Sequence, residues 1–524
     1  MNLPRFIFLS IAYFIFPVAS YFSAWFVFSN SIVIWIVSIC FYLIFLYIYF
    51  TQSKNIFHVE SFENRNLILV FVVALILMMI AYPVRNLNLG DGILIVENII
   101  LESNLFGYQL TLDELFEALL HSYLYLQFSH IASDPRIVYR VTSTVAGIIF
   151  IFLVMRFFKK KKFNSMFSLI IFSSGGMLLF FGYPENYTLT TLVILFFINT
   201  SLQKISEEKK GLKLLILPTI IASIAILFHL VAGYLIFPLI YLWYIASKKS
   251  TFIKNAVISA IIGIVIILPL FIYFIFFSDT RVDMSQTHIA HPPFYPVKKM
   301  FSTKHISEIL SNIMFTSLVP FFIFLELIFL RRSDLKFFKA YQEFTFLIVT
   351  LIGFFIHAFI FHPLLGYPSD WDIMSFYWLP FSFGAVYILQ LADYKKLFFL
   401  VTLVGLSFAI LFINAIELNK PILEKEIELY RSLSTINRFL LKNQAKIKSM
   451  NPEYKKFYFK TLYFLYKIEE NLEKNNNKKL FSDLKGFQDE LEANIKTMSP
   501  LWQKDYINRL TIFHSEYLEL IKNK

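Results

Sequence analysis

Several carboxylates in this chain stand in short polar segments between long apolar runs. Asp91 lies between Gly90 and Gly92, which permit a sharp turn and leave the carboxylate unshielded. An acid presented in this way could serve as a general base, although Asp-Gly is also a common turn dipeptide. Asp113 and Glu114 form a second acidic group, two adjacent carboxylates within a segment of helical apolar spacing.

Two further connectors carry acids. Glu185 and Asn186 lie in a tight connector, where the acid could pair with a cation, orient a ligand or cap the next helix. Asp370 and Asp372 stand two residues apart, so they can converge on a cation in a turn but would diverge in a helix. These residues make no cofactor certain, and a divalent metal ion, Mg²⁺ or Mn²⁺, stays open.

Cationic candidates lie in a later polar loop and in one apolar stretch. Arg281, Lys298, Lys299 and His305 share the polar loop, where Lys and Arg could bind a lipid phosphate or simply face solvent. His229 interrupts an apolar stretch and is either a packing residue or a functional group within the membrane.

The elements that must position these side chains are membrane-spanning helices. The chain is 57% hydrophobic and 16% charged, with a mean hydropathy of +0.63. Much of the net charge of +12 lies in short Lys/Arg-rich connectors, so a nucleic-acid partner is not needed to explain it. Apolar runs of about 20 residues, enough to cross a bilayer, recur along the chain. We predict 13 spans, near 6–28, 31–50, 67–83, 137–157, 164–182, 187–202, 212–228, 230–247, 255–277, 308–330, 343–362, 373–391 and 397–415.

The basic connectors predict the orientation of this bundle. With the N-terminus in the cytoplasm, every clearly basic connector is cytoplasmic: 51–66, 158–163, 203–213, 248–254, 331–342 and 393–396. The acidic connectors then share the outer face with two long loops, 84–136 and 278–307. This assignment of the connectors to the two membrane faces requires two helices hinged near His229 within 212–247. One long kinked helix there would reverse the orientation of every later span.

Composition changes abruptly after the last span. Residues 416–524 are charged and have a helical pattern, which Asn-Pro, Asn-rich and Ser-Pro segments divide into about four helices. We therefore predict a membrane domain over 1–415 and a small α-helical domain over 416–524, placed outside by the odd number of spans.

This arrangement resembles the GT-C superfamily of integral-membrane glycosyltransferases, which includes protein O-mannosyltransferases, oligosaccharyltransferase catalytic subunits and lipid A aminoarabinose transferases. The resemblance covers about 1–415 and rests on Gly90-Asp91-Gly92, Asp113-Glu114, the connector 182–187, Phe228-His229 and Asp370-Trp371-Asp372. Asp91 falls where the family places its catalytic acid. The usual pair of adjacent acids is absent there, and Asp113-Glu114 could be that pair, so the assignment of the base stays open.

The resemblance implies an all-α polytopic enzyme of a bacterial plasma membrane. It would transfer a sugar from a polyprenyl-phosphate donor to a lipid, glycan or protein acceptor at the outer face, with inversion and a carboxylate base. Lys298, Lys299, Arg281 or His229 would supply positive charge to the phosphate. The rival class is a flippase or transporter for a lipid-linked or anionic substrate. Transporters tend to place ionisable groups at the bilayer midplane and to contain repeats, whereas the groups here cluster at one rim.

Overall fold

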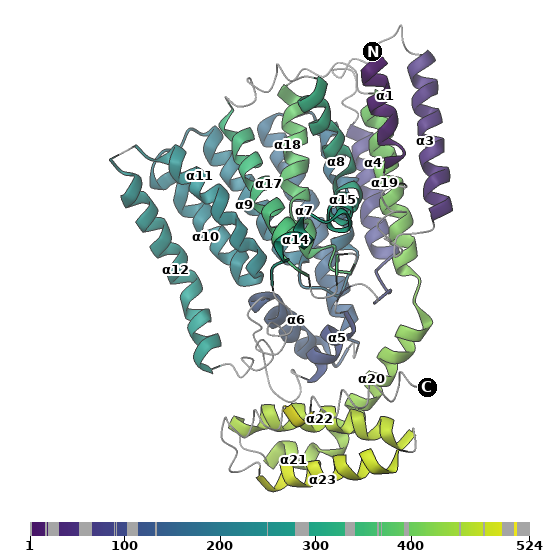
Figure 1. Cartoon of the computed structure of the whole chain (residues 1–524). Helices are drawn as coiled ribbons and strands as arrows, with labels where there is room; N and C mark the ends of the chain where they lie inside the picture. Colours follow the sequence, from purple (N-terminus) through teal and green to yellow (C-terminus); the bar gives the residue numbers. More distant parts are fainter. Residues whose placement is uncertain are drawn as a thin grey trace.

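The computed structural model describes residues 3–15, 18, 31–51, 65–87, 90, 92–101, 114–131, 134–248, 250–277, 293–330, 341–363, 366–367, 369–391, 398–449, 452–474, 477–494 and 508–510. Helices dominate these residues, which contain no strand beyond one isolated β-bridge between Phe294 and Phe361. Most of the helices run roughly side by side in one broad bundle (Figure 1).

Seven helical stretches among the described residues are long and apolar enough to cross a membrane. They are α7 (Arg136–Lys161), α9 (Thr188–Ser206), α12 (Phe252–Phe277), α15 (Thr303–Leu330), α17 (Gln342–Ile360), η8 with α18 (Ile373–Ser375 and Trp378–Leu391) and α19 (Phe398–Asn419). Further apolar helices accompany them, namely α3 (Ser31–Thr51), α4 (Arg65–Ala81), α10 (Leu212–Phe228) and η6 with α11 (Leu230–Leu235 and Ile236–Ala246). The count of 13 spans remains a prediction.

Exposed apolar side chains identify the surroundings of this bundle as lipid. On α12, Ile264 and Val265 are 55% and 64% exposed, and other large apolar residues of this helix are exposed as well. Water disfavours contiguous apolar surface of this kind, whereas lipid accommodates it. The chain is therefore an all-helical integral membrane protein.

The stretch 164–182 is not the single span that the sequence predicts. It consists of three short pieces, η4 (Ser165–Phe167), α8 (Ser168–Phe172) and η5 (Gly175–Phe180). At the break, the Ser174 hydroxyl accepts a hydrogen bond from the Gly176 N–H at 3.2 Å. A Cβ at Gly175 would meet the Phe315 carbonyl, and one at Gly176 would meet the Trp378 ring. Close packing against α15 and α18 thus replaces a continuous helix.

The hinge predicted within 212–247 is confirmed. His229 is extended (φ −155°, ψ 136°) between α10 and η6, and its Nδ1 accepts a hydrogen bond from the Val231 N–H at 3.1 Å. The elements α10 and α11 then pack side by side (Figure 1). Two helices rather than one long helix therefore occupy this stretch.

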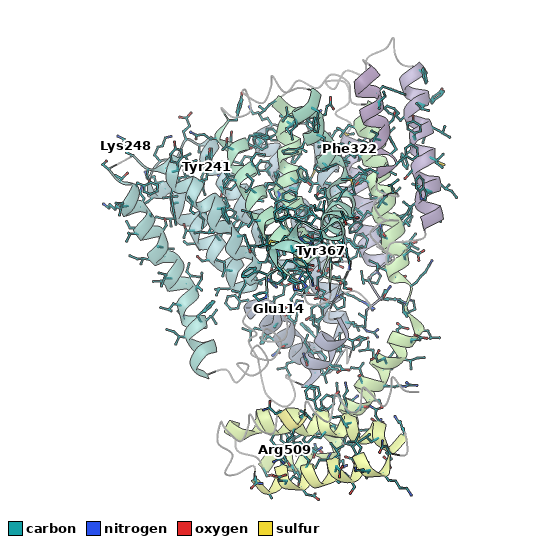
Figure 2. All side chains as sticks on the ribbon, in the orientation of Figure 1. Glu114, Tyr241, Lys248, Phe322, Tyr367 and Arg509 are labelled. Atoms are coloured by element: carbon teal, nitrogen blue, oxygen red, sulfur yellow. The ribbon has the colours of Figure 1, made fainter. Side chains whose placement is uncertain are left out.

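Ion pairs join several predicted basic connectors at one end of the bundle. Lys160 lies 3.5 Å from Glu207, and Lys161 lies 3.0 Å from Glu343. Tyr241 donates to the Gln342 carbonyl at the same end, and Figure 2 shows Tyr241 and Lys248 far from Glu114 and Arg509. The connectors at 158–163, 203–213 and 248–254 therefore share one face, as predicted. The side of the membrane that this face meets remains a prediction.

The opposite end carries two helices of the first long loop and the C-terminal helices (Figure 1). The loop helices are α5 (Gly92–Leu101) and α6 (Leu115–Phe128). The C-terminal helices are α20 (Leu423–Lys442), α21 (Gln444–Ser449), α22 (Pro452–Lys474) and α23 (Lys478–Asn494). Buried residues such as Phe439 and Phe459 form a core with Ile99 of α5 and Tyr125 of α6. The C-terminal helices therefore pack directly on the first loop.

The end of α19 holds the chain that leaves α4. The Leu418 carbonyl accepts hydrogen bonds from the Arg85 and Asn86 N–H groups at 2.8 and 2.9 Å. The Asn419 amide donates to the Pro83 carbonyl at 2.7 Å. These bonds fix residues 83–86, which lead toward Asp91.

The C-terminal helices contact the segment around Gly90 from the side of α5. Leu429 of α20 is fully buried and packs with Leu87 and with Val96 of α5. Lys467 of α22 pairs with the buried Glu97 at 2.8 Å. The segment around Gly90 is thus supported from both of its ends by residues more than 300 positions later in the chain.

Candidate functional site

The connector between η5 and α9 lies against the glycines that flank Asp91. Gly90 has φ +63°, and a Cβ there would overlap the Glu185 carboxylate. A Cβ at Gly92 would come within 3.1 Å of Pro184 Cγ. Only glycine fits such a close approach at position 90. Three predicted site residues, Asp91, Asp113 and Arg281, lie outside the described residues.

Tyr187 is the side chain on which the described acids converge. It caps the N-terminus of α9 and is 8% exposed. Burial raises the pKa of its hydroxyl well above the usual value, and nearby negative charges raise it further. Those charges belong to Asp372, Glu185, Glu114 and Asp370. The His229 ring lies 5.0 Å from the Tyr187 ring, so this histidine joins the same cluster.

Asn186 connects this cluster to α6 and α7. Its amide Nδ2 donates to Glu114 Oε2 at 2.6 Å, and its Oδ1 accepts from the Tyr139 hydroxyl at 3.1 Å. The Tyr139 ring stacks on His121 with 3.9 Å between centroids, and His121 Nε2 lies 3.0 Å from Thr142 Oγ1. Hydrogen bonds and one ring stack therefore connect Glu114 to the connector and to α7.

Glu117 is a buried acid that the sequence did not single out. Its carboxylate accepts hydrogen bonds from the Leu189 N–H at 3.1 Å and the Thr190 hydroxyl at 3.1 Å, at the N-terminus of α9. Burial outweighs these bonds and raises the pKa of Glu117 to about 7. Burial also lowers the pKa of His121 to about 4. Glu117 and His121 lie four residues apart, a spacing that places two polar groups on one helical face.

The two aspartates before η8 occupy a turn, not a helix. Asp372 is buried and its Oδ1 accepts a hydrogen bond from the Ile373 N–H at 2.8 Å. Both aspartates lie close enough to Tyr187 to raise the pKa of its hydroxyl, so they converge as a turn allows. Among the described residues, no group of three or more His, Cys, Asp or Glu side chains is arranged to hold a metal ion.

His305 belongs to a neighbouring cluster. Its Nδ1 lies 3.9 Å from Glu308 Oε2, and its ring lies 4.4 Å from the Tyr295 ring. Burial raises the pKa of Tyr295 to about 12, and the charges of Glu308 and Asp370 act in the same direction. Asp370 therefore acts on both Tyr187 and Tyr295, and it links the two clusters.

The predicted lysines lie apart from the acids in the described structure. Lys298 and Lys299 are exposed on the short helix α14 (Val297–Met300). No hydrogen bond or ion pair joins either side chain to the described acids. The structure therefore brings together Glu114, Glu185, Asn186, His229, Asp370 and Asp372, with His305 beside them.

No protein-family model matches the sequence, and no curated protein sequence matches it. The chain is similar to two crystal structures of ArnT from Cupriavidus metallidurans. For the apo state the TM-score is 0.41 at 10% identity, over 87% of this chain and 75% of ArnT. For the state bound to undecaprenyl phosphate the TM-score is 0.43 at 9% identity, over 87% and 76%.

Proposed function

We propose that this membrane protein is a glycosyltransferase of the GT-C type. It would transfer a sugar from a polyprenyl-phosphate donor to a lipid, glycan or protein acceptor. The observation that carries the proposal is the gathering of acids from three segments at one end of the bundle. Glu114 accepts a hydrogen bond from Asn186, Glu185 lies against Gly90, and Asp370 and Asp372 lie within electrostatic reach of Tyr187. Acids from three separate segments form this cluster, as the resemblance of the sequence to GT-C enzymes leads one to expect.

In the proposed reaction a carboxylate removes the proton from the acceptor hydroxyl. The alkoxide-like oxygen attacks the anomeric carbon, a new carbon–oxygen bond forms, and the bond to the lipid phosphate breaks. The phosphate leaves with the electron pair, and one direct displacement inverts the anomeric centre. Positioning and stabilisation of the leaving phosphate would supply much of the acceleration.

Asp91 is the proposed base, with Asp113 and Glu114 as alternatives. Its flanking glycines contact the connector that carries Glu185, so the base would stand beside the acid cluster. The other acids would orient the sugar hydroxyls by accepting hydrogen bonds. We place this site and the domain over 416–524 on the outer face of a bacterial plasma membrane, with the membrane domain over 1–415 and the N-terminus in the cytoplasm.

Asp91→Asn tests this function because it keeps the shape of the side chain and removes the base. Transfer from a polyprenyl-phosphate sugar to membrane acceptors would be measured with purified protein. We expect turnover to fall by about 10²–10⁴, the usual share of general acid–base catalysis. Binding of the lipid donor should survive, since the carboxylate does not hold the phosphate. Asp483→Asn, at an exposed position of α23, is the matched control and should keep full activity.

Undiminished transfer by Asp91→Asn would move the base to Asp113 or Glu114. If the wild-type protein forms no glycosidic bond with any donor but moves labelled lipid between leaflets, the enzyme proposal is wrong. The rival transporter class would then be favoured.

A further inference from the structure

The first two turns of α20 expose an apolar stripe. Leu423, Ile427 and Tyr430 are 70%, 40% and 57% exposed. They stand four and then three residues apart, so they follow one face of the helix. Another face of α20 is buried, since Leu429 packs on Leu87. The helix therefore presents two apolar faces, and the described part of the chain covers only one of them.

Two membrane-length helices end beside this stripe. Only residues 420–422 separate α20 from α19, which ends at Asn419. Arg136, the first residue of α7, lies 3.8 Å from Glu426 and holds its guanidinium 5.7 Å from the centre of the Tyr430 ring. Both α7 and α19 are long and apolar enough to cross a membrane, so their ends mark the boundary of the lipid. The stripe thus lies at the level of that boundary.

The surface of α7 next to this contact is also apolar. Ile137 directly follows Arg136 and is exposed, and Val141 is exposed one turn further into the span. Exposed apolar side chains on a helix of membrane length face lipid. The lipid-facing surface of α7 therefore begins at the residue that α20 contacts, and the stripe extends this surface onto the C-terminal domain.

The apolar character of this face of α20 ends within the helix. Ser434 and Asn437 continue the same face after Tyr430, and both are exposed. In Figure 1, α20 runs from the end of α19 toward the layer formed by α22 and α23. The face is therefore apolar where it is close to the bundle and polar farther away, as expected for a helix that leaves a membrane surface.

A protein partner fits this stripe poorly. Glu424 and Glu428 are exposed along its border, and the polar residues Ser434 and Asn437 limit its length. Stable protein interfaces take about 20–30 residues from each side. Three apolar side chains provide too little area for such an interface, whereas a helix at a membrane surface needs only a narrow apolar face.

We propose that Leu423, Ile427 and Tyr430 bind the lipid surface and anchor the C-terminal domain to the membrane. Leu423 and Ile427 enter the boundary between headgroups and acyl chains, where amphipathic helices are buried by about 5–10 Å. The Tyr430 ring lies at headgroup level, which suits an amphipathic ring. Since Leu429 of the same helix packs on Leu87, the anchored turns also support the first long loop.

Spin labels can report the surroundings of the stripe directly. Cys40 is the only cysteine of the chain, so Cys40→Ser provides a background for single labels. Ile427→Cys carries a nitroxide within the stripe. The matched control is Leu441→Cys, because Leu441 is also exposed but lies about 16 Å beyond Tyr430 along α20. The purified full chain would be placed in phosphatidylcholine nanodiscs, one copy to a disc.

Collisions of the label with oxygen, which concentrates in lipid, and with a water-soluble nickel chelate separate the two surroundings. We expect the Ile427 label to meet the chelate several-fold less often than the Leu441 label, and to meet oxygen more often. Leu423→Cys should repeat this result, and it replaces Ile427→Cys if thermal unfolding shows that variant to be misfolded. Equal chelate collision rates at the stripe and at Leu441 would overturn the anchor.

The same labels distinguish lipid from a second copy of the chain. In a disc that holds one copy, no second copy can shield Ile427. If shielding appears only in discs that hold two copies, the stripe joins copies of the chain and the lipid assignment is wrong.

The anchor does not depend on the proposed function, because the measurement uses no substrate. An Ile427 label open to water in a protein that transfers sugar would refute the anchor and leave the enzyme standing. A lipid-shielded label in a protein that transfers no sugar from any donor would refute the enzyme and leave the anchor standing.

Discussion

Replacing Glu117 with Gln should change the way in which stability depends on pH. Burial raises the pKa of this acid from 4.5 to about 7 in the folded protein, despite the hydrogen bonds from Leu189 and Thr190. Between these two values the folded protein retains a proton that the unfolded chain has released. A glutamine at this position stays neutral at every pH, and its amide oxygen can still accept a bond from the start of α9.

The sign and size of the effect follow from this difference. Below pH 4.5 both states are protonated, and the stability that Glu117 contributes is fully present. As the pH rises toward about 7 that contribution is lost, because proton release favours the unfolded state. At about 1.4 kcal/mol per unit of pKa difference, the loss reaches about 3 kcal/mol.

Thermal unfolding of the purified protein in detergent, across about pH 4 to 8, measures this loss. Relative to Glu117→Gln, the wild type should lose on the order of 5 °C in Tm as the pH rises. Other titrating groups are common to both proteins and cancel in the comparison. Glu473→Gln, at an exposed position of α22, should follow the wild type. Parallel curves for wild type and Glu117→Gln would refute the claim that burial outweighs hydrogen bonding here.

Two further substitutions extend these tests. His121→Phe keeps a ring against Tyr139 but removes a group whose pKa falls from 6.5 to about 4 on burial. Wild-type stability should therefore decline relative to this variant as the pH falls below 6.5, by up to about 3 kcal/mol in the same unfolding assay; no difference in slope would contradict it. Leu429→Ala removes a fully buried side chain and should cost about 2–5 kcal/mol of unfolding free energy, while Leu441→Ala, at an exposed position, should cost far less. Equal Tm values for the two variants would show that the contact of α20 with the first loop is unimportant.

The apolar pattern of the sequence predicted those helices whose course does not depend on contacts with residues distant in sequence. Apolar runs of membrane length and the polar interruption at His229 were enough to predict the seven membrane-length helices of the described residues and the hinge between α10 and α11. The break at Ser174 was missed because it depends on Phe315 and Trp378, which are distant in sequence and leave no space at Gly175 and Gly176. No local pattern records such a contact.

In the candidate site, too, the sequence identified some residues and missed others. Glu185, Asp370 and Asp372 attracted notice because they are acids in connectors between apolar runs. Tyr187 did not, since it is one of 29 tyrosines and only its surroundings distinguish it.

The residues that support the segment around Gly90 lie far later in the sequence, and this has a consequence for biosynthesis. Pro83 and Glu97 receive their partners, Asn419 and Lys467, only after 336 and 370 further residues have been made. Membrane helices enter the bilayer in order of synthesis, so the loop must wait through most of translation for contacts of such high sequence separation. A nascent chain that stalls before α20 has Asn419 but carries the first long loop without Leu429 and Lys467. Synthesis of α20 and α22 therefore completes the packing that holds this segment in place.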